Sequence, residues 1–165
     1  MNYSLPEFLS HAIALEQEAE ERYTELAEMM DVHSNRDTSK VFRDMARFSK
    51  LHGSEILERA RTVELRVLKS WEFRWRLPPE VGDEDGVHYL MKPYHALQYA
   101  RGNEIRGRDY YRSVAESSDN PEVRRLADEF ANEETAHVAA LDRLIAITPM
   151  PSVAWAEDLD SPQAQ

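Results

Sequence analysis

Four long stretches of the chain place apolar residues three and four positions apart, and this helical spacing is the feature that most restricts the fold. Only five glycines in 165 residues argue against a turn-rich β protein. The chain is therefore expected to be all-α. The four stretches run from Leu5 to at least Met30, from about Asp37 or Thr38 to about Lys69, from Pro93 to about Ser118, and from Pro121 to about Thr148.

Between the second and third stretches the helical pattern is interrupted. Residues 71–92 contain a Pro-Pro pair, two glycines and an acidic cluster, so residues 70–92 are expected to form a long crossover. Two helices, a crossover and two more helices predict a four-helix bundle over residues 1–148. Residues 149–165 are Pro-rich and acidic, and they are expected to form a flexible tail unless Trp155 docks on the bundle.

Helix-start signals stand where two of the stretches begin. Ser4 and Glu7 have the spacing of a capping box, and Pro6 fits the first turn. Asn120 and Pro121 fit the N-cap and the first position of the last helix. These signals set the expected helix starts.

The composition excludes several kinds of site and partner. With no cysteine, the chain has no disulfide, zinc–thiolate site, iron–sulfur centre or thiol nucleophile. The formal net charge of −11 argues against a nucleic-acid partner. No apolar run approaches the ~20 residues of a membrane span, and the N-terminus turns acidic where a signal peptide stays apolar. The expected location is the cytoplasm.

The two halves of the chain resemble each other weakly. A shift of 88 positions pairs Glu16 with Glu104, and a shift of 85 positions pairs His52 with His137. The paired residues lie on the apolar faces of their helices, where packing alone needs neither glutamate nor histidine. The fourth stretch also contains Glu134, one helical turn before His137, so both side chains can reach one point.

Taken one at a time, these residues have ordinary explanations. A glutamate beside an apolar stripe usually reaches solvent, and a lone histidine such as His52 is often a core or boundary residue. Tyr23 and Tyr111, which the repeat also pairs, are expected to pack in the core. The histidines without a partner at ligand spacing are expected at the surface or its boundary: His11, His33, His88 and His95.

Taken together, the glutamates and histidines of four helices would meet at mid-bundle. Buried without compensation, each ionised group would cost several kcal/mol, and a cation cluster removes that cost. Carboxylate and imidazole ligands without thiolate suit iron or manganese, with zinc possible. We therefore predict a metal site made of Glu16, His52, Glu104, Glu134 and His137.

This pattern resembles the ferritin-like di-iron carboxylate proteins, most closely the ferritin-like domain of rubrerythrin. In that family two helices each give one glutamate, and the other two each give a Glu-x-x-His pair. The resemblance makes Glu16 and Glu104 the single glutamates and Glu134–His137 one complete pair, over residues 4–147. It implies two iron ions, with one possible.

The chain departs from the family pattern in three places. Ser49 stands where the second Glu-x-x-His pair has its glutamate, and Gly107 stands where rubrerythrin has an additional glutamate. Without cysteine, the rubredoxin iron centre that feeds electrons to rubrerythrin is absent. Glu20, one turn from Glu16, Glu55, one turn after His52, or a water would have to replace the missing ligand.

Three functions follow from this pattern. The first is a di-iron or degenerate di-iron oxidoreductase, peroxidase-like or ferroxidase-like, that takes electrons from a separate donor or from Fe(II) itself. The second is a non-catalytic protein holding one structural ion, which Ser49 favours. The third is a helical interaction module without metal. A homodimer is expected in each case, with Trp71, Phe73 and Trp75 as candidate buried anchors.

Overall fold

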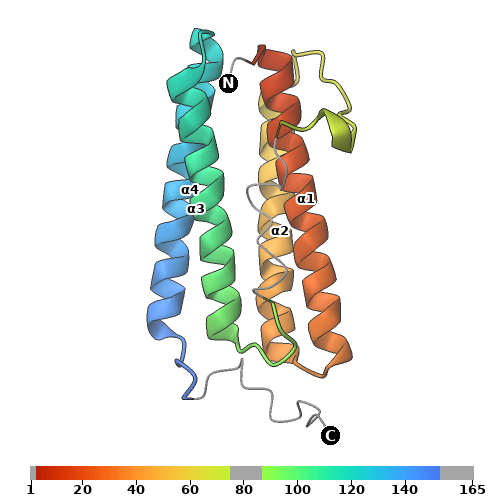
Figure 1. Ribbon diagram of the computed structural model, residues 1–165, viewed down its shortest axis with the longest axis vertical. Helices are drawn as coiled ribbons and strands as arrows, with labels where there is room; N and C mark the ends of the chain where they lie inside the picture. The colour runs from red at the N-terminus through yellow and green to blue at the C-terminus, as the bar shows by residue number, and fades with distance from the viewer. Residues whose placement is uncertain (1–2, 75–86, 153–165) are drawn as a thin grey trace, which may run out of the picture.

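The computed structural model describes residues 3–74 and 87–152, and in these ranges it has helices and no strands. The predicted all-α, ferritin-like four-helix bundle is confirmed (Figure 1). A short 3₁₀ turn, η1 (Ser70–Glu72), lies in the crossover. The four long helices are α1 (Leu5–Val32), α2 (Arg36–Arg59), α3 (Pro93–Ser117) and α4 (Pro121–Ile147).

The bundle consists of two antiparallel hairpins that stand side by side (Figure 1). α1 packs chiefly against α2, and α3 packs chiefly against α4. Contacts between the hairpins are fewer and join α2 to α3 and α1 to α4. The two hairpins also meet through side chains, because both clusters of buried apolar residues include members of each hairpin.

Two of the helix starts are fixed by the caps that the sequence predicts. Ser4 accepts a hydrogen bond from the Glu7 backbone N–H, and the Glu7 carboxylate accepts one from the Ser4 N–H at 2.9 Å. Asn120 accepts hydrogen bonds from the N–H groups of Glu122 and Val123 at 3.0 and 3.4 Å. These contacts satisfy donors that a helix terminus leaves open.

The second helix ends at Arg59, so the prediction that it continues to about Lys69 is wrong. The apolar residues that suggested continuation instead lie on a chain that leaves the helix. Val63 and Leu65 pack against the buried residues beside α1, whereas Val67 is exposed. The Ser10 hydroxyl holds this segment by accepting a hydrogen bond from the Arg66 N–H at 3.1 Å.

Two clusters of buried apolar residues fill the bundle, one on each side of its middle. Phe8, Tyr111 and Phe130 belong to the cluster at one end, and Tyr23 and Phe42 belong to the cluster at the other. The α1 positions 15 and 19 fall in different clusters, which places the polar position 16 at their boundary.

Several apolar residues of the predicted pattern lie outside the core. Phe48, which the pattern placed on the buried face of α2, is 55% exposed. Trp71 is 77% exposed in the single chain, with the Lys69 ammonium over its ring. Trp75, Trp155 and most of the predicted tail lie outside the described residues. None of the described helices is long and apolar enough to cross a membrane.

Candidate metal centre

The predicted ligands come from all four helices and meet near the middle of the bundle. α1 supplies Glu16, α2 supplies His52, α3 supplies Glu104, and α4 supplies both Glu134 and His137. The three glutamates are buried, with 3 to 8% of their surface exposed. A buried glutamate needs a partner, so the contacts among these side chains decide what the site can hold.

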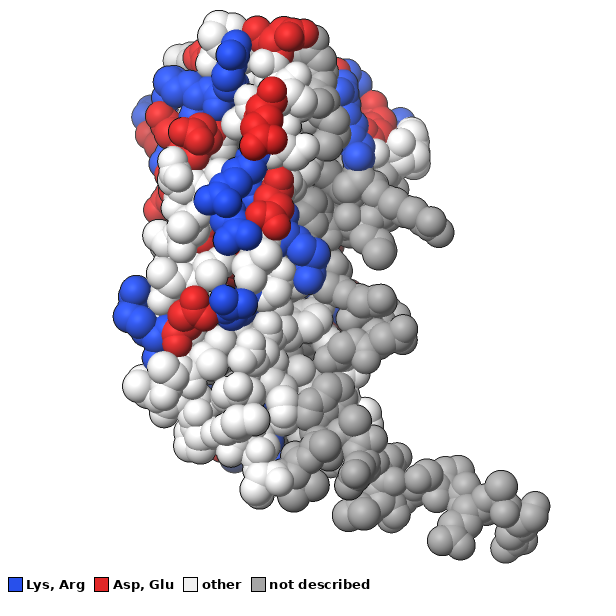
Figure 2. All heavy atoms as spheres, turned by 60° about the vertical axis from the view of Figure 1, so that its left-hand side comes forward, with Lys and Arg blue, Asp and Glu red and all other residues white. Residues whose placement is uncertain are grey.

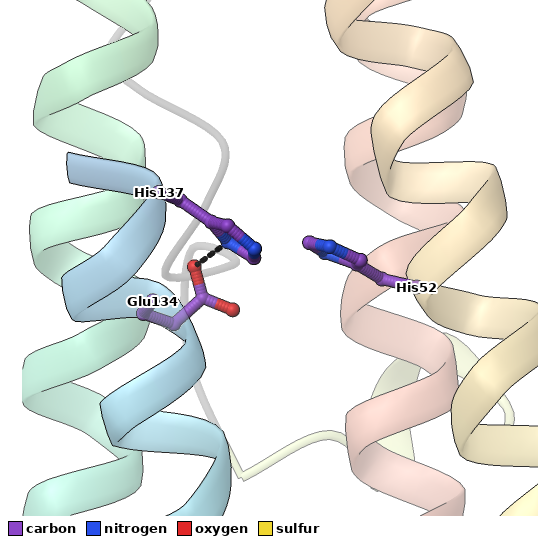
Figure 3. Close-up of side chains that lie close together, drawn as sticks. All are labelled: His52, Glu134 and His137. Carbon is purple, nitrogen blue, oxygen red and sulfur yellow. Dashed lines mark hydrogen bonds and ion pairs between the residues drawn. The ribbon is translucent and has the colours of Figure 1, made fainter. Parts of the chain in front are cut away.

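His52, Glu134 and His137 form the centre of the group. Their ligand atoms all lie within 4.8 Å of one another, a spacing that one metal ion can bridge. Figure 3 shows His52 reaching from one hairpin toward His137 and Glu134 on the other. The two imidazole rings are stacked, with centroids 4.1 Å apart.

The remaining two glutamates each contact one of these histidines. Glu16 Oε1 lies 3.6 Å from His52 Nδ1. Glu104 Oε2 lies 3.2 Å from His137 Nδ1, and Glu134 Oε2 lies at the same distance from that nitrogen. The structure therefore brings all five predicted residues into one connected cluster.

The carboxylates and the imidazole of His137 shift each other's proton affinity. Burial raises the pKa of Glu16 and raises that of Glu134 well above its usual value. Burial also opposes ionisation of Glu104, but hydrogen bonds from His137 and Glu134 outweigh it and lower the pKa of Glu104. Burial disfavours charge on His137, yet bonding to Glu104 and Glu134 raises its pKa to about 10. The His137 imidazole therefore carries a proton at neutral pH.

Ser49 is buried and lines the same hollow as Glu16, His52, Glu104 and His137. This position agrees with the alignment of Ser49 and His52 with the family's second Glu-x-x-His pair. Ser49 offers a hydroxyl where that pair has a carboxylate. Of the two suggested replacements, Glu20 pairs with the Lys50 ammonium at 3.3 Å. Glu55 lines a small cavity beside Glu16, His52 and Glu134, which makes Glu55 the nearer candidate.

Asn103 is a polar residue of the site region that the sequence reasoning missed. It is fully buried, and its Nδ2 donates a hydrogen bond to the Tyr23 hydroxyl at 2.8 Å. Arg106 donates to its Oδ1. Asn103 shares the buried face of α3 with Ala100, Gly107 and Tyr110. Its spacing from these residues could have predicted from the sequence that Asn103 is buried.

His11 also differs from its prediction. It is 2% exposed rather than a surface or boundary residue, and its Nδ1 donates to the Glu7 carbonyl oxygen at 2.7 Å. The Tyr3 ring packs edge-on at 5.0 Å. His33 is exposed and His88 and His95 are partly buried, as predicted, and Tyr23 and Tyr111 pack in the core.

The helical bundle and its carboxylate–histidine cluster define a ferritin-like protein suited to binding metal. A sequence profile of the rubrerythrin family matches residues 7–71. A solved structure, an uncharacterized conserved protein from Magnetospirillum magnetotacticum MS-1, is 62% identical and covers 92% of this chain and all of that one, with a TM-score of 0.67. The chain belongs to the rubrerythrin family. No curated protein matches it significantly.

Proposed function

We propose that the protein binds iron, at most two ions per chain, through Glu16, His52, Glu104, Glu134 and His137. The convergence of His52, Glu134 and His137 within 4.8 Å is the observation that carries the proposal. Manganese and zinc suit the same oxygen and nitrogen donors. Among the residues that the structure describes, no lysine or arginine is bonded to the three buried carboxylates, so they fit a cation better than they fit a packed core.

The raised pKa values of Glu134 and His137 also support metal binding. A metal would replace the proton on His137, and the raised pKa of Glu134 means that a metal would also favour its ionised form, because only deprotonated groups are ligands. With two ions, His52 and His137 would each hold one, and Glu134 would be shared between them. Glu16 and Glu104 complete the set from α1 and α3.

We further propose an oxidoreductase of the peroxidase or ferroxidase type. Bound iron would supply the electrons that reduce peroxide or dioxygen. The chain would hold the ligands in place, and the hollow beside Ser49, His52 and His137 would admit a small oxidant. We also propose that the protein forms a homodimer, takes electrons from a separate donor and works in the cytoplasm. These three points are predictions.

A non-catalytic protein with one structural ion is the alternative, and Ser49 favours it. A neutral hydroxyl cannot balance a second cation as a carboxylate does. The number of ions bound therefore separates the two functions.

Metal content by mass spectrometry and an anaerobic Fe(II) titration test the proposal. Wild-type protein purified without a tag or chelator should carry metal or take up one to two Fe(II) per chain. His137→Ala should weaken binding at least ~10-fold, since it removes a ligand from the centre of the cluster. His88→Ala is the matched control, because its Nδ1 accepts a hydrogen bond from the Leu90 N–H outside the site. Metal-free protein without Fe(II) uptake would leave only the helical interaction module.

A further inference from the structure

A large apolar groove leads from the cluster toward the far end of α2 and α4. Its volume is about 710 Å³, which is within the ~300–1,000 Å³ of small-molecule sites. Glu16, His52, Glu104 and His137 lie at one end, and Lys40 and Thr148 lie at the other. The walls between these ends are mostly apolar, with Met45, Phe48, Leu51, Leu97 and Leu144 among them, and they also carry the ion pair of Arg47 with Asp44.

The groove is long enough for an extended chain. Lys40 and His52 lie on one helix, and twelve residues at a 1.5 Å rise separate them by about 18 Å. Because carbon–carbon bonds of about 1.5 Å zigzag, an extended alkyl chain advances about 1.3 Å per carbon, and a chain of twelve carbons, about 14 Å long, fits within that distance. The groove thus has the length of one alkyl chain with a head group.

Apolar side chains near the groove are exposed to an unusual degree for a monomer. Phe48, Leu51 and Leu144 each have about half of their surface exposed, at 55, 54 and 46%. Figure 2 shows charged side chains gathered on the upper part of one face, while the lower part, where α4 ends, is mostly uncharged. Exposed apolar surface of this kind marks a site that is covered in the working protein.

Charge distinguishes the two ends of the groove. Glu16 and Glu104 make the inner end acidic, so an anionic head is repelled from it in the metal-free protein. At the outer end Lys40 also lines a shallow neighbouring hollow with Arg36 and Arg43. Arg43 pairs with Asp31, and Arg47 pairs with Asp44, which leaves Lys40 and Arg36 as the cations without an ion pair among the described contacts of this end.

We propose that this groove binds a long-chain fatty acid, with its carboxylate at Lys40 and its alkyl chain running toward His52 and His137. Lys40 and Arg36 complement the head, and the apolar walls cover the chain. Removing the alkyl carbons from water stabilises the complex. The site goes beyond the proposed metal chemistry, because neither the walls nor Lys40 belongs to the ligand set.

Isothermal titration calorimetry with dodecanoate tests the inference on the full chain, with and without bound metal. Dodecanoate should bind one per chain, while dodecyltrimethylammonium, which has the same tail and the opposite charge, should bind at least ~10-fold more weakly. Because the groove needs no ion, dodecanoate should also bind in the presence of a chelator. If the protein does not bind metal, the fatty-acid inference is unaffected. If it does not bind dodecanoate, the proposed metal site is unaffected.

Two pairs of variants locate the binding site. Leu144→Glu should abolish dodecanoate binding, whereas Ile147→Glu, a change of the same kind on α4 at an 80% exposed position that does not line the groove, should leave it unchanged. Lys40→Glu should weaken dodecanoate but not dodecanol, and Lys50→Glu should affect neither. If Leu144→Glu does not fold, Phe48→Glu tests the same wall.

Three results would overturn the inference. Equal binding of the anionic and cationic amphiphiles, or equal effects of Leu144→Glu and Ile147→Glu, would show that the groove does not select a fatty acid. The same conclusion follows if dodecanoate does not bind and Leu144→Glu instead converts a dimer into a monomer in analytical ultracentrifugation. That last result would assign the apolar wall to a second copy of the chain.

Discussion

At the scale of single residues, His137 lies between two acidic side chains. Its Nδ1 lies 3.2 Å from two different carboxylates, Glu104 and Glu134, and its raised pKa keeps a positive charge between them. This charge offsets part of the repulsion among the buried carboxylates. A bound cation would take over that part of the compensation.

Ser49 offers the sharpest test at this scale. Ser49→Glu adds a fourth carboxylate to three that face the four positive charges of two ferrous ions, so it should tighten binding of the second ion and speed its oxidation by peroxide. Without metal, the same carboxylate is buried beside Glu16 and Glu104, and the free energy of unfolding should fall by about 2–4 kcal/mol. Thermal melts with and without metal, together with stopped-flow oxidation of Fe(II), measure both effects.

Ser49→Gln is the control for side-chain size, because it fills the same space without charge. If Ser49→Glu melts like wild type in both states and oxidises iron no faster, position 49 does not act on the cluster. Glu55 would then be the candidate for the missing ligand.

His11 predicts a pH dependence that is independent of the metal site. Burial lowers the pKa of His11, while the Glu7 and Glu72 carbonyl oxygens and the Glu7 carboxylate favour its charged form and Arg74 disfavours it. The folded state therefore prefers the neutral ring. Stability from this preference is present above the unfolded pKa of about 6.5 and is lost as pH falls below that value.

We expect the melting temperature of His11→Gln to depend less on pH between about 5 and 7 than that of the wild type. His33→Gln should keep the wild-type profile, since His33 is exposed. Parallel profiles for wild type and His11→Gln would show that His11 does not titrate in this range.

At the scale of helices, the N-cap of α4 matters because this helix supplies two of the five ligands. Asn120 accepts hydrogen bonds from two backbone N–H groups at the start of α4. Asn120→Ala should lower the free energy of unfolding by about 1 kcal/mol, measured by urea denaturation. Asn120→Asp should retain most of the stability, because its carboxylate accepts the same hydrogen bonds. No loss in Asn120→Ala would mean that the cap contributes little, and equal losses in both variants would mean that the accepted hydrogen bonds are not its source.

The helices also show how much of the fold could be predicted from the sequence. Local chemistry at Ser4, Pro93 and Asn120 predicts helix starts, and the structure has all three starts within a residue. The end of α2 at Arg59 has no such signal, because residues 60–69 contain neither glycine nor proline. That end depends on tertiary contacts, such as the hydrogen bond from the Arg66 N–H to Ser10, which periodicity does not contain.

The site follows the same division. Glu16, Glu104 and the two histidines could be located because the two halves repeat and because Glu134 and His137 have ligand spacing. Burial of Asn103 and His11 depends on which neighbour covers them, Tyr23 in one case and Tyr3 in the other. Those neighbours lie 80 and 8 positions away along the chain, and only the packed bundle brings them together.

At the scale of the whole molecule, the proposed ligands are divided between the two hairpins. α1 and α2 carry Glu16 and His52, and α3 and α4 carry the other three. A bound ion would therefore join hairpins that make fewer contacts with each other than within themselves.

Metal at ~100 times its dissociation constant should raise the free energy of unfolding by about 2.7 kcal/mol, which corresponds to a melting temperature higher by about 5–10 °C for a chain of this size. Differential scanning fluorimetry with Fe(II) under anaerobic conditions, reversed by chelator, measures the shift. At the same metal concentration, His137→Ala should reduce the shift by about half or more, because a 10-fold loss of affinity leaves about 1.4 kcal/mol. A shift of the same size in His137→Ala would place the stabilising ion elsewhere.

The division of the proposed ligands between hairpins also bears on what a change at position 49 can reach. Ser49 belongs to α2, whereas Glu134 and His137 both belong to α4 and contact each other directly. A serine at position 49 leaves a second ion short of one negative charge, but it touches neither side of the Glu134–His137 contact on α4. The charge of one half of the site can therefore vary while the pair on the other half stays as it is.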